Sequence, residues 1–176
     1  MTDHTENTLR AVSKALTDVV APAVDPKDPL ANEQLRLVID YVNFMRQRLD
    51  RLGDRERFEL TQHVQMAAAL TGLTGLASAS VRNNLDTSLA EGRAALTLPG
   101  APISRLRPAS ASLAGAIRQL IREAATFQAD ARRRIERCVV EASASQIMFE
   151  RSWYLPLGFE PAAGEVPPLS DILSSG

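Results

Sequence analysis

Apolar residues recur every three or four positions along most of the chain, which is the spacing of one face of an α-helix. The clearest run alternates steps of three and four residues without a fault, through Leu35, Val38, Val42, Met45, Leu49 and Leu52. Leu37, Tyr41 and Phe44 widen this apolar face, which predicts a helix packed against two neighbours. Gly53 follows and is predicted to end the helix.

A shorter helix is predicted before this one. Its apolar positions also step by three and four residues, through Leu9, Val12, Leu16 and Val19. Pro22 is predicted to end it, because proline lacks the amide hydrogen and clashes with the preceding turn. Residues 22–28 are then a linker, and Asp28 followed by Pro29 supplies an N-cap and a first helical residue for the next helix.

Two further helices are predicted between Asp54 and Pro99. The first includes Phe58 and Val64, and the second carries an apolar side formed by Val81, Leu85, Leu89, Gly92 and Leu96. Gly72 and Gly75 lie between them. Two glycines three residues apart either break a helix or allow another helix to cross closely, and a break is the favoured interpretation.

The C-terminal part holds the longest helical pattern. Gly115 is the only helix breaker between Pro108 and Trp153, and one extra four-residue step from Ala131 to Ile135 interrupts the rhythm. A continuous helix of about 45 residues would be roughly 68 Å long, whereas a compact domain of this size is about 40 Å across. The segment therefore bends, splits into two helices or extends to another subunit, and the sequence does not decide among these.

Together these patterns predict an all-α protein. We expect a bundle domain of about five helices over residues 1–153, with a long C-terminal helix, followed by an extended arm over residues 154–176. The start of the arm is apolar and would form an unusual exposed patch in water. We therefore expect it to dock on its own bundle or on another subunit, through Trp153, Tyr154, Leu155, Leu157 and Phe159.

Charge and composition limit the partners and the compartment. A net charge of −1 over 176 residues argues against a general binder of nucleic acids or of anionic membranes. The polar, acidic N-terminus lacks the basic start and apolar core of a signal peptide. Residues 60–81 carry no charge, but they contain too many polar side chains to span a lipid bilayer. These features predict a cytoplasmic protein that does not associate with membranes.

The chain offers little material for catalysis. Cys138 is the single cysteine, so it can form neither an internal disulfide nor a cysteine zinc site, and we expect it to be a small buried apolar residue. A di-iron site needs two Glu-x-x-His pairs, but Leu60 occupies the position three residues before His63. No nucleophile elbow, Walker loop or dinucleotide fingerprint is present. We expect no metal and no cofactor, and the sequence favours a non-enzymatic role.

Two groups of residues are either purely structural or part of a binding site, and the sequence leaves both possibilities open. His63 is expected to be a hydrogen-bonded structural histidine, but it could instead anchor a small-molecule pocket with Tyr41, Gln62, Gly72 and Gly75. The second candidate is the least compensated basic cluster in the chain. It could be a solvated helix face, a partner surface or an anion or nucleic-acid site, and it consists of Arg132, Arg133, Arg134 and Arg137.

The sequence as a whole predicts a non-enzymatic interaction or scaffold protein that forms a homo-oligomer, most simply a dimer. The overlong C-terminal helix, its irregular step and the apolar arm motivate this hypothesis, because together they exceed what one small bundle buries. A small-molecule-binding or catalytic bundle with a pocket near His63 is the first alternative. Nucleic-acid binding through the arginine cluster is the second.

Overall fold

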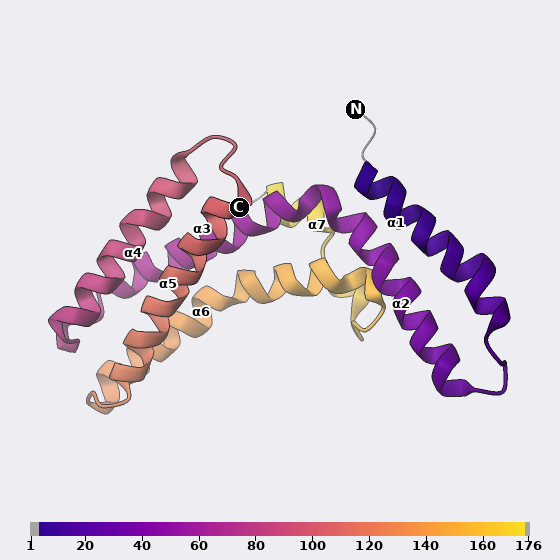
Figure 1. Cartoon of the computed structure of the whole chain (residues 1–176). Coiled ribbons are helices and arrows are strands. Elements are labelled where there is room, and N and C mark those ends of the chain that lie inside the picture. Colours follow the sequence, from indigo (N-terminus) through magenta and orange to yellow (C-terminus); the bar gives the residue numbers. More distant parts are fainter. Residues whose placement is uncertain (1–3, 175–176) are drawn as a thin grey trace. The chain divides into compact units, whose positions relative to one another are not determined.

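The computed structural model describes residues 4–174, which are almost entirely helical and contain no strand, so the predicted all-α fold is confirmed (Figure 1). The helices are α1 (His4–Ala15), α2 (Pro29–Arg48), α3 (Leu52–Thr71), α4 (Ala79–Thr97), α5 (Ile103–Ala124), α6 (Ala129–Tyr154) and α7 (Leu169–Ser174). They form two compact units. The first contains the residues up to Leu52 together with Tyr154–Ala163, and the second contains Gly53–Trp153 and the segment from Gly164 onward. The predicted division into residues 1–153 and 154–176 places the boundary elsewhere.

The first unit is built on a hairpin of α1 and α2, which run side by side in opposite directions (Figure 1). Asp28 caps α2 as predicted, since its carboxylate accepts a hydrogen bond from the Ala31 amide at 2.9 Å. The end of the first helix differs from the prediction. A π-helical turn at Leu16–Val20 follows α1, and Pro22 lies in a 3₁₀ turn at Ala21–Ala23, so the regular helix stops well before the proline.

The prediction that Gly53 ends the second helix is wrong. The α-helical geometry of α2 stops at Arg48, a 3₁₀ turn covers Leu49–Arg51, and Gly53 lies in the first turn of α3. A glycine inside a helix costs only about 1 kcal/mol relative to alanine, so the sequence signal for a stop is weak when helical residues follow.

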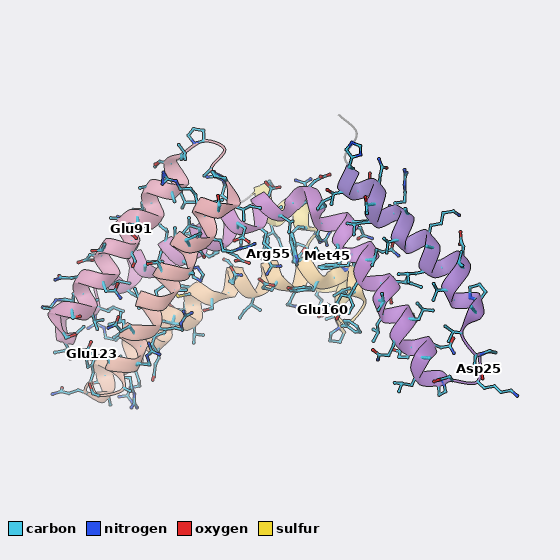
Figure 2. The ribbon with its side chains drawn as sticks, viewed as in Figure 1. Asp25, Met45, Arg55, Glu91, Glu123 and Glu160 are labelled. Carbon is cyan, nitrogen blue, oxygen red and sulfur yellow. The ribbon has the colours of Figure 1, made fainter. Side chains whose placement is uncertain are left out.

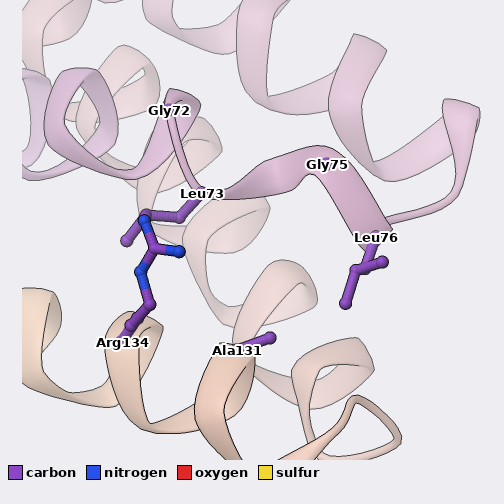
Figure 3. A pocket seen from close by; sticks show the side chains of 6 residues that line it. All are labelled: Gly72, Leu73, Gly75, Leu76, Ala131 and Arg134. Atoms are coloured by element: carbon purple, nitrogen blue, oxygen red, sulfur yellow. The ribbon is translucent and has the colours of Figure 1, made fainter.

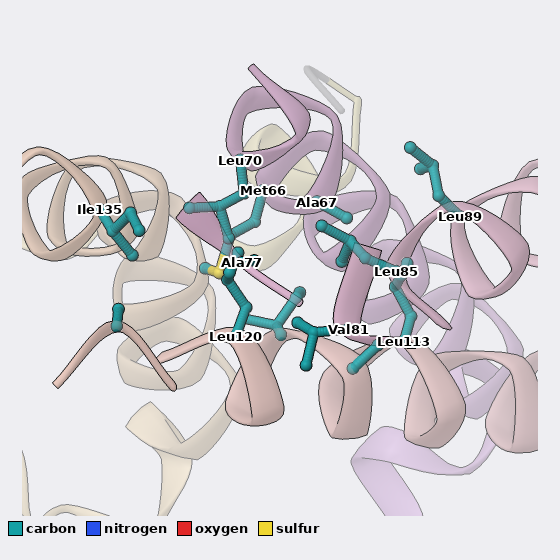
Figure 4. Close-up of a cluster of buried hydrophobic side chains, with 13 residues drawn as sticks. Met66, Ala67, Leu70, Ala77, Val81, Leu85, Leu89, Leu113, Leu120 and Ile135 are labelled. Carbon is teal, nitrogen blue, oxygen red and sulfur yellow. The ribbon is translucent and has the colours of Figure 1, made fainter. Parts of the chain in front are cut away.

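The second unit packs α3, α4, α5 and α6 around one apolar core. Figure 4 shows this core, and its fully enclosed side chains include Leu70 of α3, Leu85 of α4, Leu120 of α5 and Ile135 of α6. The break predicted between the third and fourth helices is confirmed, because α3 ends at Thr71 and α4 begins at Ala79.

The start of α4 is held by the end of α5. The Ser78 amide donates a hydrogen bond to one carboxylate oxygen of Glu123 at 2.8 Å, and the Ser78 hydroxyl donates to the other at 3.1 Å. Figure 2 shows Glu123 beside this end of the α4–α5 pair. A carboxylate at a helix N-terminus satisfies free amides and opposes the positive end of the helix dipole.

The long C-terminal pattern splits into two helices. α5 ends at Ala124, and the amides of Thr126 and Phe127 then donate to the carbonyls of Glu123 and Ala124 in a tight turn. α6 begins at Ala129, so the irregular step after Ala131 lies inside a regular helix and does not mark the break. The overlong helix therefore no longer supports oligomer formation.

The tail is only partly extended. A 3₁₀ turn covers Leu155–Leu157, and α7 is a short helix within the predicted extended arm. Within the second unit, the Ser152 hydroxyl donates to the Pro167 carbonyl at 2.9 Å, and Val166 is buried. The segment after Gly164 is thereby attached to the end of α6.

Candidate interaction surface

The seam between α1 and α2 is polar. The Ser13 hydroxyl donates a hydrogen bond to the side-chain oxygen of Asn43 at 2.9 Å, and the Arg46 guanidinium donates to the same oxygen at 3.2 Å. Arg46 also lies 3.8 Å from the Glu6 carboxylate. Among the described residues of α1 and α2, only Ser13 and Phe44 are buried. The hairpin is thus held together at its centre by polar contacts and not by an apolar core.

Four of the ten apolar residues in the two stripes predicted from the sequence are exposed. In the two stripes read from the sequence, Leu9, Leu16, Leu35 and Val42 are half-buried. The residues that alternate with them keep much of their surface in solvent: Val12 is 41% exposed, Val19 69%, Val38 48% and Met45 44%. Tyr41, beside the second stripe, is 49% exposed. One neighbouring helix is therefore not enough to cover either stripe.

The exposed residues of the two helices emerge on the same side of the hairpin. At 3.6 residues per turn, Val12 lies about 100° from the seam residue Ser13. Val38 and Met45 lie about 100° and 120°, in the same rotational sense, from Ile39, which is half-buried one turn before Asn43. Because α1 and α2 run in opposite directions, equal rotations bring both rows to one side. We call Val12, Val38, Tyr41 and Met45 the hairpin face.

The opposite side of the hairpin carries the charges. Arg36 donates to Glu33 at 2.7 Å and to Asp40 at 3.0 Å, and Lys14 pairs with Asp18 in the π-helical turn that follows α1. The hydrogen bond from Arg36 lowers the pKa of Glu33. Exposed pairs of this kind contribute little to stability. Their position matters more, since it leaves the hairpin face free of ionised groups.

The buried residue of α2 is covered by the predicted arm. Within the first unit, the Phe44 ring stacks on Tyr154 with 5.6 Å between centroids, and the Arg48 guanidinium lies 5.7 Å from the Phe44 ring centre. The other arm residues of this unit are less enclosed: Leu155 and Leu157 are half-buried, and Phe159 is exposed. Trp153 belongs to the second unit and is buried there.

His63 makes a hydrogen bond to a neighbouring helix. In the second unit, its Nδ1 lies 2.8 Å from the Ser110 hydroxyl of α5. Partial burial lowers the pKa of His63, Glu59 opposes this effect, and Arg118 adds to it. Gln62 beside it is buried. Tyr41, the other side chain of the predicted pocket, belongs to the first unit.

The two glycines of the predicted pocket line a different hollow. Gly72 and Gly75 enclose a space of about 390 Å³ with Arg134 and the apolar side chains of Leu73, Leu76 and Ala131, as Figure 3 shows. The structure therefore places these glycines beside the basic cluster of α6. A larger open groove of about 690 Å³ lies between the end of α4 and the start of α5, with Glu91 and Arg105 among its lining residues.

The basic cluster is partly neutralised by its own helix. Arg132 lies 3.4 Å from Glu136 and Arg133 lies 2.5 Å from Asp130. Arg134 and Arg137 have no carboxylate partner within residues 4–174. Cys138 follows them and is half-buried where full burial was predicted, and burial together with Glu141 raises the pKa of its thiol.

A second polar cluster joins α3 to α6. Arg55 donates to Glu59 at 2.8 Å and to Glu150 at 3.3 Å, and its guanidinium lies 4.9 Å from the Trp153 ring centre. Burial raises the pKa of Glu150 despite the nearby Arg55. The four-residue spacing of Arg55 and Glu59 is visible in the sequence, but Glu150 comes from a helix 95 residues away.

Residues 4–174 contain no arrangement typical of a metal site. Within the described range, no group of three or more His, Cys, Asp or Glu side chains is placed to hold a metal ion. None of the helices described in residues 4–174 has the length and apolar character required to cross a membrane. Comparison with known proteins gives no relative: no family model, no curated protein and no solved structure matches this chain.

Proposed function

We propose that the chain is a cytoplasmic, non-enzymatic interaction protein that binds a protein partner through the hairpin face. The observation that supports this is the two-sided character of the hairpin. Its seam is polar at Ser13 and Asn43, its charged pairs lie on one side, and large apolar side chains lie exposed on the other.

Burial of the apolar side chains of this face favours binding of a partner. Full burial of a large apolar side chain stabilises by about 1.5–3 kcal/mol. Val12, Val38, Tyr41 and Met45 are each about half exposed, so covering them contributes roughly 1 kcal/mol per side chain. Rigid helices also lose little conformational freedom on binding, which favours affinity.

The alternatives have less support. Catalysis or ligand binding around His63 would need its polar neighbours to converge on one cavity, but Gly72 and Gly75 line a hollow with Arg134 and Tyr41 lies in the other unit. Nucleic-acid binding would use the α6 arginines, and two of these four are paired with acidic residues of the same helix.

Photocrosslinking tests the proposed function whatever the partner. A photoreactive amino acid is placed at Val38 in the full chain, expressed in the host, and the matched control carries it at Arg36 on the charged side of the same helix. We expect a discrete crosslinked protein from Val38 and none from Arg36. Equal crosslinking from both positions, or none from Val38, would contradict an interaction role for this face.

A further inference from the structure

We infer that the partner of the hairpin face is a second copy of this chain, so that two α1–α2 hairpins pack face to face as a four-helix bundle. This inference rests on the proposed function, since it names the partner of the same surface. The inference is more specific than oligomer formation, because it assigns the interface to particular residues of α1 and α2.

The spacing of the apolar residues fits this arrangement. In a four-helix bundle each helix packs against two neighbours, through apolar residues three and four apart. In the hairpin each helix has one neighbouring helix. Correspondingly, Leu35 and Val42 are half-buried, while Val38 and Met45, which alternate with them, are exposed. A second hairpin supplies the missing neighbour for both helices at once.

The size of the surface also agrees with a stable dimer. α2 has 20 residues and α1 has 12, followed by 5 in the π-helical turn, which correspond to about 30 Å and about 25 Å. Two helices of about 10 Å diameter then give a face of roughly 550 Å² per copy. Two such faces total about 1,100 Å², just above the roughly 1,000 Å² expected of a specific interface. A two-helix unit with only Ser13 and Phe44 buried in its helices is also the kind of small fold that oligomerisation commonly completes.

The charge distribution favours a second copy over a membrane surface. A twofold interface brings identical patches together, so it requires that the patch does not repel itself. The hairpin face meets this condition because its members are valine, tyrosine and methionine. Helices that lie on membranes carry a polar side rich in Lys and Arg. Here that side mixes both signs in the Glu33, Arg36 and Asp40 group.

Light scattering after size-exclusion chromatography tests the inference with the full chain. We expect a mass near 38 kDa at micromolar concentration, twice the 19.1 kDa of one chain. The double variant Val38→Glu/Met45→Glu would place charges in the interface and raise the dissociation constant at least about 100-fold, giving a monomer. The matched control is Val140→Glu, a 71% exposed valine of α6, which is expected to remain dimeric. Circular dichroism checks that each variant is helical, and Val12→Glu repeats the test from α1.

Cysteine labelling separates failure of this inference from failure of the proposed function. In a Cys138→Ser background, Val38→Cys reports whether the face is open. A monomer that labels rapidly overturns the second copy as partner but leaves the face available for another protein. A monomer that labels slowly overturns both, since the face is then covered without any partner. A dimer unaffected by Val38→Glu/Met45→Glu, or binding of the wild-type chain to anionic lipid vesicles through this face, also overturns the inference.

Discussion

Gly92 lies at a point of close helix packing in the second unit. A Cβ atom at this position would lie 3.0 Å from the Cγ2 of Val64 and 3.4 Å from the nearest side-chain carbons of Leu60 and Leu113. The sequence pointed to Gly72 and Gly75 as a possible close crossing, but a Cβ at either would meet nothing within 4 Å. The glycine that allows close helix packing is therefore Gly92. The sequence had indicated only that Gly92 belongs to the apolar side of its helix.

Gly92→Ala is expected to destabilise the protein. Alanine normally stabilises a helix by about 1 kcal/mol relative to glycine, but here it overpacks the core, which costs about 1–3 kcal/mol. Val64 cannot easily yield because its χ1 angle is restricted in a helix. The control is Gly115→Ala, where the nearest atom is the end of the Arg118 side chain at 3.9 Å.

Urea denaturation measures both variants. Gly115→Ala is expected to raise the free energy of unfolding by about 0.5–1 kcal/mol, and Gly92→Ala to lower it by about 1 kcal/mol. Equal stabilisation by both substitutions would show that the helices separate freely at Gly92.

His63 is expected to make stability fall on acidification. Its pKa in the folded protein lies below its ordinary value of 6.5, because partial burial disfavours the imidazolium. Above about pH 6.5 the residue is neutral in both states, and its contribution to stability is complete. Below that pH the unfolded chain binds the proton first, so stability is lost as the pH falls toward the folded pKa.

The His63→Gln variant isolates this effect. The difference between wild type and His63→Gln in free energy of unfolding should decrease from pH 7.5 to pH 5.5. Glu150 acts in the opposite direction, since its pKa is raised and its contribution is largest at low pH and declines as the pH rises. Glu150→Gln is therefore the control, and its difference from wild type should change with the opposite sign. A His63→Gln difference that does not vary with pH would contradict the prediction.

At the scale of elements, the sequence correctly predicted that α2 is a helix but did not predict what surrounds it. The faultless three-four spacing from Leu35 to Leu52 predicts an apolar helix face, and the helix is present. In the structure, however, the buried aromatic residue is Phe44, and the seam residue Asn43 is polar. Periodicity gives the direction of a face but not the identity of what covers it.

The rate of amide hydrogen exchange is expected to differ between the two units. The helices of the hairpin bury few side chains, whereas α4 and α5 surround fully buried Leu85 and Leu120, so amides in α1 and α2 are expected to exchange faster at low protein concentration. Raising the concentration above the dissociation constant of the proposed dimer should slow exchange in α1 and α2 and leave α4 and α5 unchanged. Equal protection of all four helices at every concentration would contradict this.

At the scale of the whole molecule, the chain forms two units whose boundaries the sequence did not reveal. Residues 154–163 belong to the unit that begins at the N-terminus, and the segment after Gly164 belongs to the other. No Pro- or Gly-rich linker separates α2 from α3, so composition gives no signal. Such a division depends on contacts between distant segments, among them Phe44 with Tyr154.

The sequence by itself determined the all-α fold, the capped start of α2 at Asp28 and the break near Gly72, because these depend on interactions between residues close together in the chain. Tertiary structure decided that the long C-terminal pattern divides at residues 125–128, that Arg55 joins Glu59 to Glu150, and that Val38 and Met45 face solvent. Each of these depends on which surfaces meet across large sequence separations. Local periodicity contains no information about that choice.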